Sequence, residues 1–239
     1  MFFFKSILLG LVVGLSACAF VAPKSAVTTN HAFGPGWLAF NFPGKTPTDY
    51  TPEHKGGRAA MRADAVSSAS MLRRTVRIVP QDLGSVKFSW QVPALIEKAD
   101  LAARDKSDSP VRLVLAFEGD RSRFSAKDSM LSELSHALTG EPMPYATLMY
   151  VWSNTLPAGT VVKSGRTDRI RKLVVESGSK NLNAWLDYER DVAADFELAF
   201  GERPGALVGI GLMTDSDNTR TTAQAWYGRV TLAKAASPY

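Results

Sequence analysis

The feature that most constrains the fold of this chain is a series of short, strand-like segments separated by turn-forming residues. In residues 86–92, Val86, Phe88 and Trp90 alternate with the polar Lys87 and Ser89. This period of two is typical of an antiparallel strand that buries one face. The segments with strand character are 37–42, 58–66, 86–92, 111–118, 146–153, 170–177, 206–213 and 225–233.

Two of these segments, 113–117 and 207–213, are almost continuously apolar, which indicates central strands covered on both faces. Helices are few. One is expected over 125–138 with Gly140 just past its end, and another before Gly201, capped by Asp187 or Asp191. A parallel α/β fold would need a helix between most strands. The sequence therefore predicts an all-β fold with two peripheral helices, an antiparallel β-sandwich of jelly-roll type.

The N-terminus has the layout of a secretory signal, with a basic start, an apolar stretch and small residues before Cys18. The sequence Leu15-Ser16-Ala17-Cys18 resembles the lipobox of bacterial lipoproteins, which implies cleavage before Cys18 and attachment of acyl chains such as palmitate to it. The alternative is an ordinary signal peptide that is discarded together with Cys18. We expect the lipoprotein, with a signal peptide over 1–17, a lipid-anchored tether over 18–36 and a single β-sandwich domain over 37–239.

The lipobox resemblance also implies a compartment. Ala19 follows the cysteine, and the absence of Asp there is the pattern of lipoproteins sorted to the outer membrane. We therefore expect a periplasmic protein whose membrane contact is the lipid anchor and which has no nucleic-acid partner. Cys18 is the single cysteine, so the fold lacks disulfides. No Gly-Lys phosphate loop or dinucleotide fingerprint occurs, and we expect no cofactor.

Several stretches together resemble a family of secreted bacterial proteins known as domain of unknown function 3047. Their order and spacing fit over roughly residues 37–232, and the resemblance implies a compact β-rich envelope domain without an established activity. The matching pieces are Ser67-Ser-Ala-Ser-Met-Leu72, Phe88-Ser-Trp90, Ala103-Arg-Asp105, Tyr150-Val-Trp152, Arg190-Asp191, Ala199-Phe-Gly201, Met213-Thr-Asp-Ser-Asp-Asn-Thr219 and Ala225-Trp-Tyr-Gly228.

Oxygen-bearing side chains gather after the apolar strand 206–213, at Asp215, Asp217 and Asn218. Such ligands at alternate positions suit a hard cation such as calcium, and a distant loop offers Asp105 and Asp108. Asp and Asn at a strand end more often bond to the backbone of their own turn. We therefore treat these residues, with Asp105, as candidates for ligand binding and expect no metal.

Aromatic residues on strands form a second candidate site. Trp90 lies on one predicted strand, while Tyr150 and Trp152 share a face of another by the period of two. Exposed tryptophans stack on sugar rings in many jelly-roll binding modules, so these three residues predict by analogy a glycan-facing sheet. The alternative is that they pack in the core.

Basic residues concentrate in one segment, where Lys163, Arg166, Arg169, Arg171 and Lys172 are opposed only by Asp168. This segment is either a solvated strand face or a surface for anionic lipid headgroups and phosphate-bearing polymers. The whole chain has a net charge of only +5, which does not by itself select an anionic partner.

Catalytic patterns are weak. The three histidines lie in unrelated segments, so no metal or triad spacing emerges. A glycoside hydrolase needs only two carboxylates across a cleft, which Glu118, Asp120, Asp187 and Glu189 could supply. We expect a non-catalytic envelope module that binds a glycan or a partner protein, and the alternative is a glycan-active hydrolase with such a carboxylate pair in the concavity of the sheet.

Overall fold

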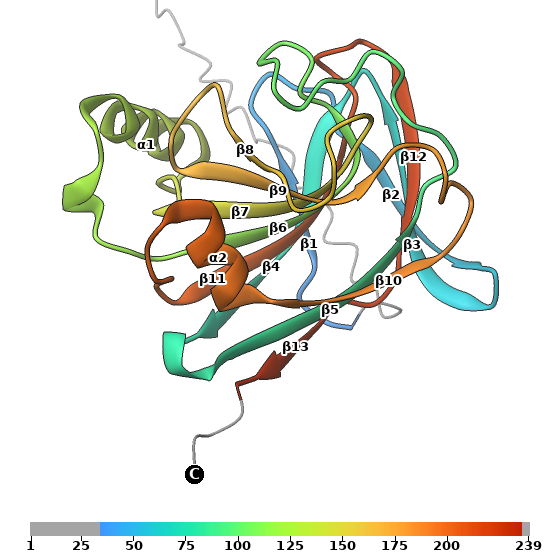
Figure 1. Cartoon of the computed structure of the whole chain (residues 1–239). Helices are drawn as coiled ribbons and strands as arrows, with labels where there is room; N and C mark the ends of the chain where they lie inside the picture. Colours follow the sequence, from blue (N-terminus) through green and yellow to red (C-terminus); the bar gives the residue numbers. More distant parts are fainter. Residues whose placement is uncertain (1–33, 236–239) are drawn as a thin grey trace, which may run out of the picture.

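The computed structural model describes residues 34–235, which form two curved sheets packed face to face, with two helices at one side (Figure 1). The predicted signal peptide and Cys18 lie outside the described residues, as does most of the predicted tether. The seven-stranded sheet consists, from edge to edge, of β1 (Leu38–Asn41), β4 (Ala69–Ile78), β11 (Leu207–Asp215), β6 (Ser109–Phe117), β7 (Ala146–Ser153), β9 (Ile170–Ser177) and β8 (Val161–Lys163). The six-stranded sheet consists of β10 (Leu186–Asp191), β5 (Leu83–Gln91), β12 (Thr222–Tyr227), β3 (Arg58–Val66) and β2 (Asp49–Lys55), with β13 (Thr231–Lys234) paired to β5.

This architecture confirms the predicted β-sandwich of jelly-roll type with two peripheral helices. One pair departs from the antiparallel expectation, because β7 and β9 run parallel. The chain between them crosses over and contributes β8, which pairs antiparallel with the far side of β9. Parallel neighbours need such a crossover, whereas antiparallel neighbours can be joined by a tight turn.

The core lies between the two sheets. On β6, Leu113, Leu115 and Phe117 point into it and are at most 1% exposed. From the other sheet, Phe88 stacks on Tyr150 with ring centroids 5.5 Å apart. Burial of an aromatic or aliphatic side chain of this size contributes about 1.5–3 kcal/mol, so this layer supplies most of the drive for folding.

The helices end where the sequence predicts. Helix α1 (Ala126–Thr139) begins at Ser125, whose hydroxyl accepts from the Asp128 N–H, and it ends at Gly140 in the left-handed conformation. Helix α2 (Val192–Phe200) is capped by Asp191, and Gly201 ends it in the same way. Such caps each contribute about 1 kcal/mol and are local in sequence, which is why they could be predicted. Short 3₁₀ turns occur at Pro80–Asp82 and Arg121–Arg123.

The segment 225–233 contains two strands where the sequence predicts one. β12 ends at Tyr227, and β13 begins at Thr231. Gly228 lies between them, where a Cβ would come within 2.0 Å of the Ser89 Oγ. A larger residue here would have to displace the Ser89 hydroxyl of β5, and the chain bends at Gly228 before it pairs again. Among residues 34–235, no helix is long and apolar enough to cross a membrane.

Candidate ligand groove

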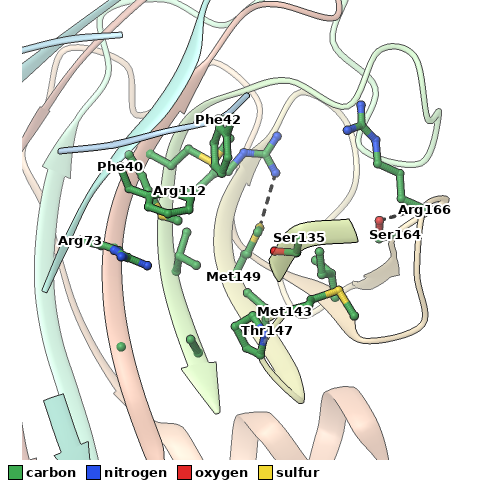
Figure 2. A pocket seen from close by; sticks show the side chains of 18 of the residues that line it. Phe40, Phe42, Arg73, Arg112, Ser135, Met143, Thr147, Met149, Ser164 and Arg166 are labelled. Atoms are coloured by element: carbon green, nitrogen blue, oxygen red, sulfur yellow. Dashed lines mark hydrogen bonds between the residues drawn. The ribbon is translucent and has the colours of Figure 1, made fainter. Parts of the chain in front are cut away.

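A groove of about 1430 Å³ runs along the outer face of the seven-stranded sheet, the face turned away from the other sheet (Figure 2). Its volume exceeds the roughly 300–1,000 Å³ of a pocket for a drug-sized molecule, so it suits an extended ligand. Strands of the sheet form its floor. β1 lies along one side, α1 along the other, and the loop 101–107 closes one end. We call this feature the ligand groove. Residues on its floor include Met71, Arg112, Val114, Ala116, Thr147, Met149, Lys172, Gly209, Gly211 and Met213.

The alternation of strand side chains explains why this face is hollow. On β6, Leu113 and Leu115 face the core, whereas Arg112, Val114 and Ala116 face the groove. The neighbouring strand β11 contributes glycine to the floor at Gly209 and Gly211. Small side chains in the middle of the sheet leave room that larger ones would fill.

Helix α1 forms one wall and is held by polar contacts near both of its ends. Asp128 lies in the first turn, is 3% exposed and accepts a hydrogen bond from the Thr167 hydroxyl in the loop before β9. Beyond the other end, Glu141 forms an ion pair with Arg73 of β4, across the groove floor. Leu134 and Leu138 line the groove from α1 and are 52% and 59% exposed.

At the opposite side, β1 contributes two phenyl rings. Phe40 and Phe42 lie edge to face with ring centroids 5.5 Å apart, and both line the groove. The guanidinium of Arg73 lies 4.2 Å from the centroid of the Phe40 ring, a cation–π contact. The Phe42 ring has no such contact in the described part of the chain. Figure 2 shows both rings at the rim above Arg112.

One end of the groove holds a buried ion pair. The Arg112 guanidinium donates from Nε and Nη2 to the two carboxylate oxygens of Asp215, at 2.9 and 3.0 Å. The Asp215 carboxylate also accepts the backbone N–H of Ser109 at 3.0 Å. Burial raises the pKa of the Asp215 carboxyl above its ordinary value, and Arg112 opposes that shift. The only partner of the other terminal nitrogen, Nη1, in the described part of the chain is the Met149 sulfur at 3.9 Å, a weak acceptor (Figure 2).

A second buried cation lies beside this pair. Lys172 of β9 is 5% exposed, and its Nζ donates to the Leu101 carbonyl oxygen at 2.9 Å and to the Ser107 hydroxyl. Burial, reinforced by the charge of Arg112, lowers the pKa of Lys172 to about 7. Two cations therefore share this end of the groove, and Asp215 is bonded to only one of them.

The acidic residues predicted from the sequence do gather here, but in structural roles. The oxygens of Asp108, Asp215 and Asp217 lie within 4.8 Å of one another. Asp108 accepts from the Asn218 side chain at 2.7 Å and from the Thr219 N–H at 2.7 Å. Asp217 forms an ion pair with Lys45 at the groove edge. Because each carboxylate already has donors, this arrangement is typical of a braced turn.

The remaining residue of that prediction, Asp105, does not join the cluster. It is exposed on the loop 101–107, while its neighbour Asp108 is 1% exposed and bonded to Asn218 and Thr219. Asp217 and Asn218, two of the residues predicted to bind a ligand, line the groove, and their role in binding stays a prediction.

The aromatic prediction needs correction. Trp90, Tyr150 and Trp152 are at most 1% exposed and lie in the core between the sheets, so their rings cannot face a ligand in solvent. Two of the three side chains form hydrogen bonds within the protein. The Tyr150 hydroxyl donates to Asp195 at 2.8 Å, and the Trp152 Nε1 donates to the Gly178 carbonyl oxygen at 2.9 Å. Core packing, the alternative interpretation, describes them.

The four carboxylates considered for hydrolysis do not form a pair across the groove. Glu118 lines it but is held by Arg77, with Oε1 2.6 Å from Nη1. Asp120 caps the turn at Ser122. Asp187 and Glu189 lie on β10, in the other sheet, where Arg58 and Lys87 are their partners.

The basic segment divides between roles. Lys163 is exposed on β8, whereas Arg166 lines the groove (Figure 2). Arg171 is 8% exposed, and its guanidinium lies 5.3 Å from the centroid of the Phe200 ring of α2. Lys172, the neighbour of Arg171, points to the opposite face of the sheet and into the groove. The segment is therefore only partly a solvated face.

Comparison with known proteins gives a family and distant folds. The family profile described as "Protein of unknown function (DUF3047)" matches residues 35–231. No curated protein matches the sequence. Among solved structures, the chain is similar to a family 11 carbohydrate-binding module of the cellulosomal cellulase Lic26A-Cel5E of Clostridium thermocellum, with 8% identity, a TM-score of 0.40 and coverage of 85% of this chain and 91% of that one.

A second solved structure is the xyloglucanase domain of NopAA, a type three effector from Sinorhizobium fredii, in complex with cellobiose. It has 10% identity and a TM-score of 0.41, and the match covers 83% of this chain and 93% of that one. Similarities this distant do not bear on what the groove binds, and the inferences below rest on the groove itself.

Proposed function

Because the chain belongs to the DUF3047 family, whose description names no activity, we propose a function from its ligand groove: it is a non-catalytic envelope module that binds a glycan along the outer face of the seven-stranded sheet. The observation that carries the proposal is the groove itself, about 1430 Å³ in volume and open along a sheet whose other face forms the core. An extended polymer segment fits such a shape better than a compact metabolite.

The lining supplies both kinds of contact that a sugar needs. Phe42 offers an apolar ring at the rim, and the Thr147 and Ser135 hydroxyls line the groove below it (Figure 2). A few placed polar groups among apolar ones are the usual composition of a ligand site, with the polar groups fixing orientation. Arg73 and Arg166 add donors at two sides of the groove.

The carboxylates support binding without turnover. Glycoside hydrolysis requires two carboxyl groups about 5–10 Å apart across the scissile bond, one of them able to give up a proton. The groove-lining Glu118 and Glu141 each accept from an arginine, Arg77 and Arg73 respectively. The hydrogen bond from Arg73 lowers the pKa of the Glu141 carboxyl, so Glu141 does not suit the role of general acid.

The envelope part of the proposal depends on Cys18 and the tether. We propose that acyl chains on Cys18 hold the protein at the periplasmic side of the outer membrane. Strand β1 begins at Leu38, just after the predicted tether. Phe40 of this strand and Phe42, just beyond its end, line the groove. Only about twenty residues would then separate the anchor from the ligand, which suits a glycan of the envelope.

The test uses the full-length protein in a mild non-ionic detergent, screened against an array of neutral and acidic oligosaccharides and then measured by titration calorimetry. We expect binding that Phe42→Ala weakens about tenfold, since ring contacts contribute about 0.5–1.5 kcal/mol. Trp185→Ala is the matched control, because Trp185 is half-buried and lies outside the groove. The proposal is wrong if no oligosaccharide binds, or if released reducing ends show that bound glycan is cleaved.

A second candidate function is favoured by the α1 wall. Leu134 and Leu138 are exposed, and Met71, Met149 and Met213 line the floor. Flexible methionines adapt to irregular apolar ligands, so an acyl chain could lie along the groove floor beside α1. Native mass spectrometry of the purified protein would detect a retained acyl ligand. Leu134→Ser should abolish it, while Leu198→Ser, at an equally exposed leucine of α2, should not.

A further inference from the structure

Two buried cations line one end of the groove, and only one of them is bonded to an acid. From this we infer that the glycan carries an acidic group, and that Lys172, Arg112 and Ser107 receive it. The inference rests on the proposed function, since it names the class of glycan bound in the same groove. We call these three residues the anion pocket.

Each carboxylate at this end of the groove already has a hydrogen-bond donor other than Lys172. Asp215 accepts two hydrogen bonds from Arg112, and Asp217 is paired with Lys45. Asp108 is occupied by the Asn218 and Thr219 donors. Within the described part of the chain, Lys172 forms no ion pair. A positive charge that is 5% exposed without an acidic partner is costly, and an anionic ligand would remove that cost.

The donors of the anion pocket converge from three elements. Lys172 projects from β9, Arg112 from β6 and Ser107 from the loop before β6. The Lys172 ammonium has three N–H groups, of which two are directed to Leu101 and Ser107. Among residues 34–235, the Arg112 Nη1 has only the Met149 sulfur as a partner, at 3.9 Å. A carboxylate or phosphate oxygen would be a far better acceptor for the third Lys172 N–H and for the Arg112 Nη1.

The groups facing Lys172 account for its titration. Burial is the largest cause that lowers the pKa of Lys172 to about 7. The charges of Arg112 and Arg166 lower it further, while Asp215 and Asp100 raise it. An anion bound beside the amine favours the charged form, so binding should take up a proton above pH 7. Affinity for an acidic glycan should therefore fall as the pH rises from 7 to 9.

Arg166 extends the positive potential toward the open side of the groove. Its side chain lines the groove (Figure 2). Its Nη2 lies 3.5 Å from the Asn218 Oδ1. No carboxylate is bonded to it among residues 34–235. An approaching acidic polymer would meet Arg166 first and the anion pocket behind it.

The experiment compares saccharides that differ only in charge, with the full-length protein in non-ionic detergent. One arm uses oligogalacturonate against its methyl ester, which tests a carboxylate. The other uses phosphorylated oligomannose against the same material after phosphatase treatment, which tests a phosphate. We expect the charged form to bind at least tenfold more tightly in one arm, and the preference to weaken in high salt.

The variants locate the effect. Lys172→Met keeps the length of the side chain and should reduce the preference for the charged form to less than about threefold. Lys163→Met removes a charge from an exposed residue of the neighbouring strand β8 and should leave the preference unchanged. Ser107→Ala provides a second test of the pocket. Thermal melts of all variants identify any that fail to fold.

The outcomes separate the inference from the proposed function. Equal binding of charged and neutral forms by the wild-type protein overturns the anion pocket and leaves glycan binding intact. A preference that survives Lys172→Met and Ser107→Ala also overturns it. Failure of every saccharide to bind overturns the proposed function as well.

Discussion

Breaking the Arg112–Asp215 ion pair should be among the most destabilising single changes in the protein. The two side chains are 3% and 6% exposed and share two hydrogen bonds, at 2.9 and 3.0 Å. Removing one partner of a buried pair leaves the other charge unpaired, which costs about 3–5 kcal/mol. We therefore expect Arg112→Met to lower the free energy of unfolding by that amount.

The double variant supplies the matched control. Arg112→Met with Asp215→Leu removes both charges, so no charge is stranded. It still loses the acceptor for the Ser109 N–H and the donor to the Ser107 carbonyl oxygen, at about 1 kcal/mol each. We expect the double variant to be about 2 kcal/mol less stable than the wild type, and therefore more stable than the single one.

The pH dependence identifies which charge is stranded. In Arg112→Met, burial raises the folded-state pKa of Asp215 without opposition, so the folded state binds a proton that the unfolded state releases. Stability from this group is present at low pH and is lost as the pH rises through the raised pKa. The deficit of the single variant should thus be smaller at pH 5 than at pH 8, and the double variant should not show this change.

Urea unfolding followed by tryptophan fluorescence measures these differences, because Trp90 and Trp152 leave the core when the sheets separate. Equal slopes of free energy against urea for all variants would validate the comparison. The reasoning fails if Arg112→Met costs less than about 1 kcal/mol, or if its deficit is the same at both pH values, because then Asp215 is not left unpaired in a buried site.

Three further predictions concern the anchor, the turn and the buried amine. Cys18→Ser should release the protein from the membrane fraction, and an unmodified Cys18 in the mass spectrum of the wild-type N-terminus would disprove lipidation. Asp217→Ala should lower stability by about 1 kcal/mol through loss of the Lys45 contact, equally with calcium or chelator, whereas a calcium-dependent melting shift of the wild type would indicate a metal site. Lys172→Met should remove a rise in stability between pH 7 and 10, because the folded pKa of about 7 lies below the ordinary 10.5 and the unfolded state binds more protons there; unchanged pH profiles would contradict this.

Local signals carried the prediction of most elements. The strands β3, β7 and β9 begin and end at the residues that the sequence predicts. The strands that sequence reasoning missed are β2, β4, β8 and β10. β2 contains Pro52 and lies at the edge of its sheet, where a missing N–H is tolerated. β4 packs Leu72, Val76 and Ile78 against the core. Its arginines Arg73 and Arg74 line the groove and Arg77 is solvated, and these charges hide the strand pattern.

The site was harder to predict because its residues come from distant segments. Phe40 and Phe42 come to line one groove with α1 and β6 only after the sheet has assembled, and nothing local to residues 37–42 indicates a groove rim. Arg112 did leave a signal that went unused. A charge within the apolar run 111–117 must be paired if that strand is central, and the neighbouring central strand ends in Asp215.

The choice between the two faces of the sheet explains why the aromatic prediction failed. The alternation along β7 places Tyr150 and Trp152 on one face of the sheet and Met149 on the other. Arg112 and Val114 of the paired strand β6 lie on the same face as Met149. The alternation cannot establish which face the second sheet covers. Burial decides this, because the covered face needs large side chains to fill the space between sheets, whereas a groove needs small or charged ones. The ligand face of a β-sandwich is therefore better sought where a central strand carries glycine, alanine and a paired charge than where it carries tryptophan.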